Sequence, residues 1–404
     1  MYRLTIGKGS YMPVDDLHDF PRAEYQRRLD GFRALMAERG MDAALVTTEA
    51  NHRYFTGHVT HRWSHHYVAI FALLPLEGEP MLVVQPNEAY MCETDSWIEN
   101  ICTFPAQHEL QGVVALVDAV HAAGLAAARI GTELGGMVPL RMPHGDFAEL
   151  RQRLPQVEFV DASPLCWALR ARKSPAEVER IRRAVAITDA AYQVLFAKIK
   201  PGMSEREVYQ LLVIEHLQRG AEMPGSITFA PHIPGDVRIH NRTLRRPTDR
   251  VLTAGELMTQ DAGGVYRGYW SDYTRMYALE RASSEHKDAY RAAYDSMQAA
   301  IEATGPGVPI ADLVHAATAA LKVSGYGECA DRITGIGHAM GLEIIEPPFI
   351  SSASDIILAE GMILTIEPGL FVGDAFCMLE EDVLVTERGC EVLSAPASPE
   401  LPVL

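Results

Sequence analysis

Two stretches of this sequence place acidic residues in pairs on either side of a turn signal. In the first, Asp261 and Asp272 flank a segment that contains three glycines. If this segment is a β-hairpin with its tip near residues 265–268, the two aspartates form a directly opposed cross-strand pair. Directly opposed β carbons lie about 5 Å apart, and two like charges at that spacing destabilise a sheet. A cation bound between the carboxylates would remove this repulsion, so the pair indicates a candidate metal site.

Residues 364–385 repeat this arrangement. Gly373-Asp374 is a two-residue hairpin turn signal, and symmetry about it opposes Glu367 to Glu380. A single acidic pair beside a turn is common in proteins that bind no metal. Two pairs in the same geometry favour one site shared by all four carboxylates.

His338 could add a nitrogen ligand to these oxygen ligands. It ends the segment Thr334-Gly335-Ile336-Gly337-His338, in which the glycines allow close approach of the backbone. Taken alone, a histidine in such a motif is more often a core residue with satisfied hydrogen bonds. Together with the hairpins it completes a set that suits two divalent ions about 3.5–4 Å apart with a bridging water. Manganese, cobalt, iron or zinc fits this set better than copper, and magnesium alone fits less well because of the histidine.

The sequence around these residues resembles the creatinase/aminopeptidase P/prolidase superfamily, the pita-bread metallohydrolases. The stretches that carry the resemblance are DAGGVYRGYWSDYTRMY, GIGHAMGLEIIEPP, EGMILTIEPGL and LEEDVLVTERGCEVL, with RARKSPAEVERIRRA and ANHRYFTG earlier in the chain. They keep the family's order of aspartate, aspartate, histidine, glutamate and glutamate, and the spacing of the two aspartates is the family's own. The resemblance covers most of the chain and is strongest over residues 173–393.

The resemblance implies a role for each ligand. Asp261 would bind one metal ion, Asp272 and Glu380 would bridge both ions, and His338 and Glu367 would bind the second ion. Glu367 would also help to activate the bridging water, whose lowered pKa lets it attack a carbonyl or amidine carbon.

The resemblance also implies positions that contact the substrate. His240, in DVRIHNRTL, resembles the family's substrate-facing histidine, and the alternative is a surface histidine. Ile345 and Thr334 each stand where the peptidase branch carries histidine, and Met378 stands where many members carry arginine. Isoleucine in place of histidine removes a donor and an acceptor that help to bind and polarise the substrate. Non-peptidase relatives such as creatinase, ectoine hydrolase and dimethylsulfoniopropionate lyase also depart at such positions.

The hydrophobic pattern predicts two domains that position these residues. Residues 1–165 alternate helical signals with short apolar runs, which indicates an α/β layered domain, by resemblance the creatinase-like N-terminal domain. Residues 166–404 combine long helices with antiparallel hairpins, an α+β pattern that the resemblance identifies as the pita-bread catalytic domain. Ser174-Pro175-Ala176-Glu177 is a capping box that opens a helix to about Lys200. We further expect helices at 23–40, 112–123, from 204, 284–304 and 309–324, and strands at 43–46, 67–74, 81–84, 129–131 and 157–160.

Residues 58–66 contain four histidines in nine residues. Their spacing fits no regular metal-ligand pattern, and the simplest interpretation is a solvated polar loop. By resemblance to the family's dimers, the loop would instead reach the neighbouring subunit's active site. There His61, Arg62, Trp63 and His65 would contact a small anionic or zwitterionic substrate.

Composition excludes other function classes. The chain has 36 Lys and Arg against 53 Asp and Glu, a net charge of −17, which disfavours nucleic acid and anionic membranes as partners. The longest apolar stretch has ten residues, short of the roughly 18 that span a bilayer, and the first twenty residues lack a signal-peptide core. We therefore expect a cytoplasmic protein. Six cysteines without a Cys-x-x-Cys pair indicate free thiols.

The sequence thus predicts a homodimeric metallohydrolase with two divalent ions per subunit, manganese being the first choice, that cleaves a C–N bond in a small molecule or dipeptide. By resemblance, the leading substrate is an Xaa-Pro dipeptide or the N-terminal Xaa-Pro bond of a peptide. The alternative is a non-peptidase of the same fold, acting on an amidino, cyclic-amide or betaine-like metabolite by hydrolysis or lyase chemistry. A second alternative is a non-catalytic binding scaffold, against which the intact ligand set argues.

Overall fold

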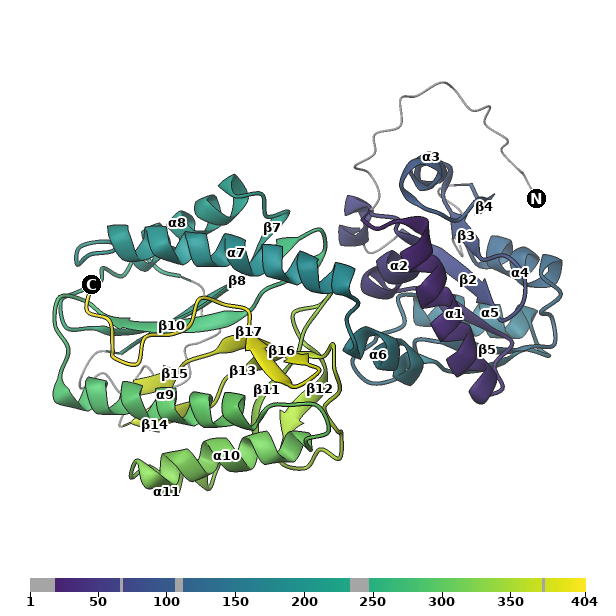
Figure 1. Cartoon of the computed structure of the whole chain (residues 1–404). Coiled ribbons are helices and arrows are strands. Elements are labelled where there is room, and N and C mark those ends of the chain that lie inside the picture. The colour runs from purple at the N-terminus through teal and green to yellow at the C-terminus, as the bar shows by residue number, and fades with distance from the viewer. Residues whose placement is uncertain (1–18, 66–67, 106–111, 233–246, 373–374) are drawn as a thin grey trace. The chain divides into compact units, whose positions relative to one another are not determined.

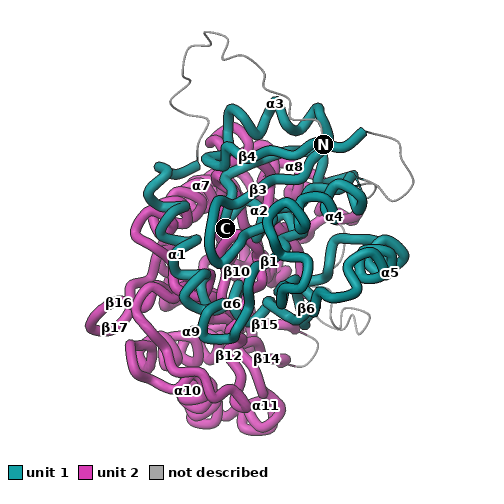
Figure 2. The backbone as a smooth tube through the Cα atoms, turned by 90° about the vertical axis from the view of Figure 1, so that its right-hand side faces the viewer, with its two compact units in different colours: residues 1–169 teal, residues 170–404 magenta. Residues whose placement is uncertain are grey.

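The chain folds into two compact units, residues 1–169 and 170–404 (Figure 2). The computed structural model describes residues 19–404 except 66–67, 106–111, 233–246 and 373–374. The division lies between Leu169 and Arg170, inside helix α6 (Ser163–Ala171), whereas the sequence placed the boundary between residues 165 and 166.

The N-terminal unit is built on one six-stranded mixed sheet in the order β4-β3-β2-β1-β5-β6. The central strands β1, β2 and β3 are buried along their whole length, as expected for short apolar runs covered by helices on both faces. The strands are β1 (Ala43–Val46), β2 (Phe71–Pro75), β3 (Met81–Val84), β4 (Asn100–Thr103), β5 (Arg129–Thr132) and β6 (Glu158–Asp161). The helices that precede α6 are α1 (Arg22–Glu38), α2 (Glu49–Thr56), the 3-10 helix η1 (His61–Ser64), α3 (Pro86–Asp95), α4 (Val113–Ala122) and α5 (His144–Arg153).

The expected α/β layering of this unit is confirmed, although the sequence analysis did not predict β4 or the helices α2, η1, α3, α5 and α6. α1 and α4 match the helices expected at 23–40 and 112–123 to within two residues at each end. The unpredicted β4 has four residues, all only partly buried, so it lacks the apolar run that marks the inner strands. The unpredicted α3 begins with proline at its first turn and has no apolar stripe.

The C-terminal unit begins with two helices that the capping signals predict. Ser174 accepts a hydrogen bond from the Glu177 amide while Glu177 accepts one from the Ser174 amide, so the capping box opens α7 (Pro175–Lys198). Ser204 and Glu207 form the same reciprocal box at the start of α8 (Glu205–Gln218). Further along the chain lie α9 (Ser284–Ala303), α10 (Ile310–Val323) and α11 (Gly327–Ala330). Among the described residues, no helix is long and apolar enough to cross a bilayer.

The strands of this unit form two main antiparallel sheets and one hairpin (Figure 1). The first sheet has the order β10-β8-β7, with β9 paired to β8, and the second has the order β12-β11-β13-β16-β17. Strands β14 and β15 form the separate hairpin. The strands are β7 (Met223–His232), β8 (Leu257–Tyr266), β9 (Tyr269–Trp270), β10 (Tyr273–Ala278), β11 (Gly335–Ala339), β12 (Glu346–Ser351), β13 (Ile363–Ile366), β14 (Gly369–Val372), β15 (Ala375–Met378), β16 (Glu381–Thr386) and β17 (Gly389–Val392).

One large apolar core fixes which face of each strand is available for chemistry. Helices α9 and α10 pack against each other and against the second sheet. Leu364 and Ile366 of β13 and Ala339 of β11 belong to this core, so the residues that alternate with them face the other way. His338 and Thr365 lie on that other face. The core thereby directs the ligand-bearing side of the sheet away from α9 and α10.

Gly337 allows β11 to approach β13 where a larger residue could not. Its φ is +138°, and a β carbon there would lie 1.9 Å from the Thr365 carbonyl oxygen. A β carbon at Gly335 would meet the Ile350 carbonyl oxygen at 3.3 Å, a contact that a small shift relieves. The close approach expected from the Gly-x-Gly-His motif is therefore confirmed at Gly337.

We predict that Gly337→Ala lowers the unfolding free energy by at least about 2 kcal/mol, because the strained φ and the clash with Thr365 add. Gly335→Ala, the matched control, should cost less than about 1 kcal/mol. Denaturant unfolding of both variants measures the difference. Equal stabilities of the two variants would contradict this account of β11.

Candidate metal centre

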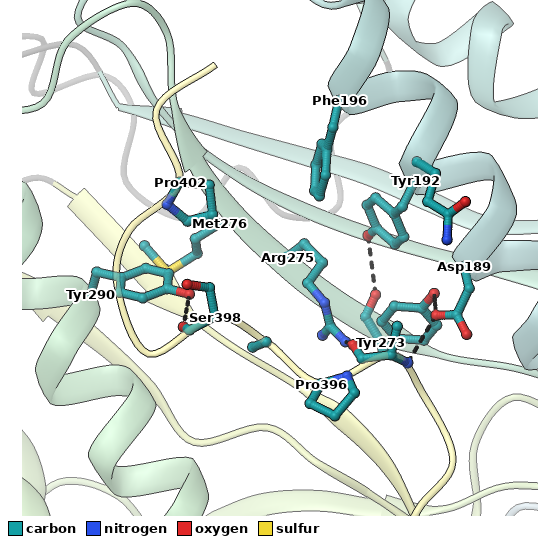
Figure 3. A pocket seen from close by; sticks show the side chains of 13 residues that line it. Asp189, Tyr192, Phe196, Tyr273, Arg275, Met276, Tyr290, Pro396, Ser398 and Pro402 are labelled. Carbon is teal, nitrogen blue, oxygen red and sulfur yellow. Dashed lines mark hydrogen bonds between the residues drawn. The ribbon is translucent and has the colours of Figure 1, made fainter.

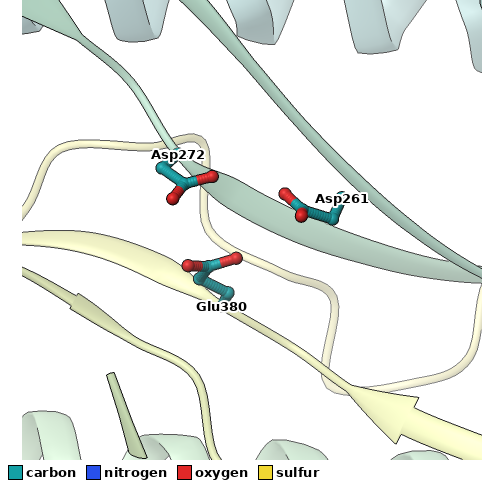
Figure 4. Close-up of side chains that lie close together, drawn as sticks. All are labelled: Asp261, Asp272 and Glu380. Carbon is teal, nitrogen blue, oxygen red and sulfur yellow. The ribbon is translucent and has the colours of Figure 1, made fainter. Parts of the chain in front are cut away.

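Three buried or half-buried carboxylates meet at one point of the C-terminal unit (Figure 4). One oxygen from each of Asp261, Asp272 and Glu380 lies within 4.8 Å of the others. Asp261 projects from β8, Asp272 immediately precedes β10, and Glu380 immediately precedes β16. The two main sheets therefore each contribute to the cluster.

His338 and Glu367 lie at the same point. His338 Nε2 is 3.5 Å from Glu367 Oε1 and 3.9 Å from Asp272 Oδ2. All five residues that the sequence nominated as metal ligands are thus brought together, although their roles as ligands stay a prediction.

The predicted register of the first hairpin was wrong, yet its aspartates still meet. Asp261 pairs with Thr274, not with Asp272, because the turn lies at Arg267-Gly268, about one residue further than expected. Both turn residues have positive φ, +47° and +81°, as a tight two-residue hairpin requires. The flanking pairs place Asp272 beside Gly263, two positions along β8 from Asp261. Because side chains alternate with period two, the aspartates become diagonal neighbours on one face.

The register of the second hairpin agrees with the prediction. Ile366 pairs with Glu381 on one side of the acidic pair, and Gly369 pairs with Met378 on the other. The β13–β16 pair and the β14–β15 pair therefore share one register, and this register places Glu367 opposite Glu380. The predicted turn at Gly373-Asp374 lies outside the described residues.

Burial raises the pKa of every carboxyl in the cluster, and repulsion by neighbouring carboxylates raises it further for Asp272, Glu367 and Glu380. Burial raises the pKa of Asp261 to about 6, and burial and the Asp261 carboxylate raise the pKa of Glu367 to about 8. Burial, followed by the charges of neighbouring carboxylates, puts the pKa values of Asp272 and Glu380 well above their usual range. Burial lowers the pKa of His338, so its imidazole is neutral and can act as a ligand.

The cluster fits divalent cations on its own chemistry. Oδ1 of Asp261 and Oδ1 of Asp272 are buried and accept no hydrogen bond within the described part of the chain. Such acceptors are costly in a protein interior unless a cation or a proton satisfies them. Four carboxylates and one neutral imidazole are hard and borderline ligands that suit manganese, iron, cobalt or zinc.

Neighbouring hydroxyls and amides hold the carboxylates in place, and sequence reasoning missed these residues. The Thr274 hydroxyl donates to Glu380 Oε2 at 2.8 Å, and the Thr228 hydroxyl donates to Asp261 Oδ2 at 3.3 Å. The Asp272 amide donates to the buried Asp382 carboxylate at 3.1 Å. Thr274 lies two residues after Asp272 on the same face of β10, so the Asp-x-Thr spacing is the signal that could have identified it.

A cavity of about 210 Å³ lies on the other face of β10 (Figure 3). Tyr273 and Arg275, which alternate with Thr274, project into it. The buried Arg275 guanidinium donates to the Glu380 carbonyl oxygen at 2.8 Å and to the Glu381 carboxylate at 2.8 Å. The Tyr273 hydroxyl donates to Asp189 at 2.6 Å. These hydrogen bonds join β10 to the start of β16, so the polar groups that line the cavity hold the two ligand-bearing strands together.

The loop that carries Ile345 is fixed by a buried ion cluster. The Glu346 side chain is fully buried between the Arg170 and Lys173 side chains, which are 2% and 1% exposed. Burial raises the pKa of Glu346, but the charges of Arg170 and Lys173 lower it by more. The net effect is a lowered pKa, so the carboxylate stays charged. Ile345, the residue directly before Glu346, is 42% exposed. Met378, at the end of β15, lies on the same face as Glu380, and it is only 7% exposed.

Residues 58–65, the described part of the histidine-rich segment, are more buried than a solvated loop and include the 3-10 helix η1. His58 is fully buried between Asp95 and Glu88, each 3.1 Å from a ring nitrogen. Burial lowers the pKa of His58, but hydrogen bonds to Asp95, Cys92 and Glu88 raise it to about 11. The imidazole is therefore an ion-pair partner of carboxylates inside the N-terminal unit.

Trp63 packs inside the N-terminal unit, where its indole is 5% exposed under the Arg141 guanidinium and beside the His52 ring. This burial leaves little of Trp63 for the substrate contact that the resemblance implied. His61 is exposed, and Arg62 pairs with Glu88 at 3.3 Å. Substrate contacts by residues 61–65 stay a prediction, and His240 lies outside the described residues.

Comparisons with known proteins identify the class to which this fold and site belong. The family model for "Metallopeptidase family M24" matches residues 179–387, and the model for "Creatinase/Prolidase N-terminal domain" matches residues 28–172. The chain therefore belongs to metallopeptidase family M24, within the creatinase/aminopeptidase P superfamily, and its C-terminal unit has the pita-bread fold.

Similar proteins span nearly the whole chain. The uncharacterized peptidase YqhT of Bacillus subtilis is 26% identical over 363 residues, 90% of this chain and 96% of its own. An uncharacterized peptidase of Staphylococcus aureus (strain MSSA476) is 29% identical over 366 residues, 87% of this chain and 94% of its own. Among solved structures, dipeptidase PepE from Mycobacterium ulcerans superposes with a TM-score of 0.79 at 26% identity, covering 95% and 99% of the two chains. An Xaa-Pro dipeptidase from Bacillus anthracis gives 0.80 at 24% identity, covering 94% and 100%, which shows likeness of fold.

The raised pKa values predict that metal removal makes stability depend on pH. Without metal, the folded protein holds protons on Glu367, Asp272 and Glu380 that the unfolded chain loses between about pH 3.8 and 4.5. Stability from these groups is present below that pH and is lost as the pH rises through about 8, the folded pKa of Glu367. Chelator-treated protein should therefore melt at progressively lower temperature from pH 5 to pH 8.

The melting temperature of metal-loaded protein should not fall in this way between pH 5 and pH 8, because its ligands are already ionised. Asp272→Asn removes one titrating carboxyl and should make the slope of the chelator-treated protein shallower. Melting temperatures that are the same with and without metal at every pH would exclude a metal centre at this cluster.

Proposed function

We propose that this protein is a hydrolase of C–N bonds that uses two divalent metal ions, with an Xaa-Pro dipeptide or an N-terminal Xaa-Pro peptide as its substrate. The observation that carries the proposal is the convergence of Asp261, Asp272, His338, Glu367 and Glu380 at one buried point. Family membership and the fold likeness to a dipeptidase and an Xaa-Pro dipeptidase support it.

Each ligand's position suits a distinct task. Asp272 and Glu380 come from different sheets, and one carboxylate oxygen of each lies within 4.8 Å of the other and of Asp261, which suits ligands shared by two ions. His338 offers a neutral nitrogen, and its Nδ1 lies 3.1 Å from the Ala339 carbonyl oxygen, so the ring can hold its proton there and present Nε2. Two divalent ions held by these residues would lower the pKa of a coordinated water and polarise the carbonyl of the substrate.

Glu367 is suited to proton transfer as well as to metal binding. Its side chain is 25% exposed, whereas the Asp272 side chain is 7% exposed, so Glu367 reaches the open side of the cluster. In the metal-free protein its pKa of about 8 already lies near neutral pH. A carboxyl in this position can accept a proton from the attacking water and return it to the leaving nitrogen.

The proposal includes manganese as the metal and a homodimer as the assembly. Manganese accepts a set dominated by carboxylates with one imidazole. The homodimer rests on the family resemblance, as does the expectation that residues 61–65 contribute to substrate binding in the neighbouring subunit.

A non-peptidase activity of the same fold is the second candidate, and Ile345 favours it. This side chain is 42% exposed and can neither donate nor accept a hydrogen bond, so it cannot polarise a peptide substrate. A small amidino, cyclic-amide or betaine-like metabolite would be hydrolysed or cleaved by the same metal cluster. A panel of Xaa-Pro dipeptides, creatine, ectoine and dimethylsulfoniopropionate distinguishes the two candidates.

Metal analysis and activity together test the proposal. Purified protein should contain about two divalent ions per chain and hydrolyse one member of the panel. Asp272→Ala should lose both ions and reduce kcat/KM by at least about a thousandfold, since a shared ligand serves both ions. Asp312→Ala, which removes a surface carboxylate on α10, should keep both ions and full activity. An active protein without bound metal would refute the proposal, and a metal-free inactive protein would favour a binding scaffold.

Ile345→His tests whether the lost imidazole limits peptidase activity. One added polar contact to the transition state supplies about 2 kcal/mol, so Xaa-Pro hydrolysis should rise by some tens-fold. Ile345→Val keeps the apolar character and should leave the rate unchanged. If the native enzyme already cleaves Xaa-Pro dipeptides at typical rates and Ile345→His adds nothing, the departure is tolerated and the non-peptidase candidate loses its support.

A further inference from the structure

A series of buried hydroxyl and imidazole groups connects helices α7 and α8 to the backbone beside Asp272. Thr188 of α7, His216 of α8 and Ser271, the residue before Asp272, are all fully buried. The Thr188 hydroxyl oxygen lies 3.0 Å from His216 Nε2 and 2.9 Å from the Ser271 hydroxyl oxygen. We call these three side chains the hydroxyl–imidazole relay. None of them is among the proposed metal ligands, so their connection to Asp272 needs another explanation.

Each hydrogen bond of the relay has a defined donor. His216 Nδ1 lies 2.7 Å from the Leu212 carbonyl oxygen, which can only accept, so Nδ1 carries the proton. Burial lowers the pKa of His216, so the ring is neutral and its Nε2 can only accept. The Thr188 hydroxyl therefore donates to Nε2 and accepts from the Ser271 hydroxyl. The Ser271 oxygen in turn accepts from the Gly264 amide at 3.1 Å. Each of the three side chains thus donates one hydrogen bond and accepts one.

The relay replaces a regular backbone hydrogen bond next to Asp272. The flanking strand pairs place Ser271 opposite Gly264 and Asp272 opposite Gly263. The Ser271 amide donates to the Gly264 carbonyl oxygen at 3.0 Å, but the Gly264 amide donates to the Ser271 hydroxyl. The Ser271 carbonyl oxygen instead turns toward Gly263, where a β carbon would lie 2.0 Å from it. Because the Asp272 amide donates to the Asp382 carboxylate, side-chain oxygens hold the backbone both before and at Asp272.

The relay lies on the side of β8 that faces away from the metal cluster. A β carbon at Gly264 would lie 2.7 Å from His216 Cδ2 and 3.3 Å from the Thr188 hydroxyl oxygen, so glycine leaves the space for both side chains. Gly264 and Asp261 are three positions apart on β8, so their side-chain directions are opposite. The relay can therefore act on the metal cluster only through the backbone that carries Asp272.

We propose that Ser271, Thr188 and His216 are positioning residues that hold Asp272 in the orientation that binds metal. The proposal rests on the proposed metal centre and adds residues from α7 and α8 to it. Its basis is that the relay ends on the residue directly before Asp272, where it substitutes for a backbone hydrogen bond. Loss of a residue that orients a metal ligand typically weakens metal binding about 10–100-fold, because the ligand is no longer held in place.

Manganese titration of chelator-treated protein tests the proposal with two substitutions at one position. Thr188→Val keeps the shape of the side chain but removes its hydroxyl, so the relay is broken and the Kd for manganese should rise about 10–100-fold. Thr188→Ser keeps the hydroxyl and should bind manganese nearly as tightly as the native protein. Calorimetry measures both Kd values, and thermal melting of the metal-free variants measures their stability separately.

Further variants distinguish positioning from general destabilisation. Ser271→Ala and His216→Phe break the relay at its two ends, and each should weaken manganese binding as Thr188→Val does. Because the three side chains act as one unit, combining either change with Thr188→Val should add little. Thr304→Val is the matched control, since it removes a buried hydroxyl at the end of α9 that donates to the Ala300 carbonyl oxygen at 2.9 Å. It should lower the melting temperature and leave the Kd for manganese unchanged.

The possible results separate failure of this proposal from failure of the metal centre. If the native protein binds manganese, an unchanged Kd in Thr188→Val, or equal losses in Thr188→Val and Thr188→Ser, would overturn the positioning role alone. A loss of affinity in Thr304→Val as large as in Thr188→Val would also overturn it. If Thr188→Val does not fold, native affinity in Ser271→Ala and His216→Phe has the same meaning. Failure of the native protein to bind manganese would overturn the metal centre and the positioning role together.

Discussion

The structure of the C-terminal unit depends on bringing four like-charged carboxyl groups together in a buried place. Burial raises the pKa values of Asp261, Asp272, Glu367 and Glu380, and repulsion adds to the rise for all but Asp261. The cluster is therefore unfavourable unless protons or cations neutralise it. The same cost makes the cluster a strong cation site. Folding energy from the large core beneath α9 and α10 has to maintain this arrangement.

The surrounding elements maintain it through contacts that the carboxylates do not make themselves. Thr274 and Arg275 are consecutive residues of β10 that bind Glu380 from opposite faces, one at the carboxylate and one at the carbonyl oxygen. Gly337 lets β11 approach β13 closely enough to bring His338 to the cluster. The ion cluster of Glu346 with Arg170 and Lys173 fixes the loop after β11. A rigid frame of this kind pre-organises a metal site.

Much of the fold and all five candidate ligands could be predicted from the sequence because strong local signals mark them. Capping boxes at Ser174 and Ser204 locate two helices, and turn residues locate both hairpins. The register around Asp261 could not be predicted, because the positive φ of Arg267 moves the turn by one residue and glycine alone does not signal that. Burial of His58 and Trp63 was missed because it depends on Glu88, Asp95 and Arg141, which are distant in sequence.

Anomalous X-ray diffraction from crystals grown with manganese tests the central claim most directly, because it locates each ion without reference to activity. The account predicts two anomalous peaks about 3.5–4 Å apart, enclosed by Asp261, Asp272, His338, Glu367 and Glu380. Crystals of Asp272→Ala grown in the same way should show neither peak. Peaks at any other position, or no peak beside these five residues in the native protein, would contradict the account.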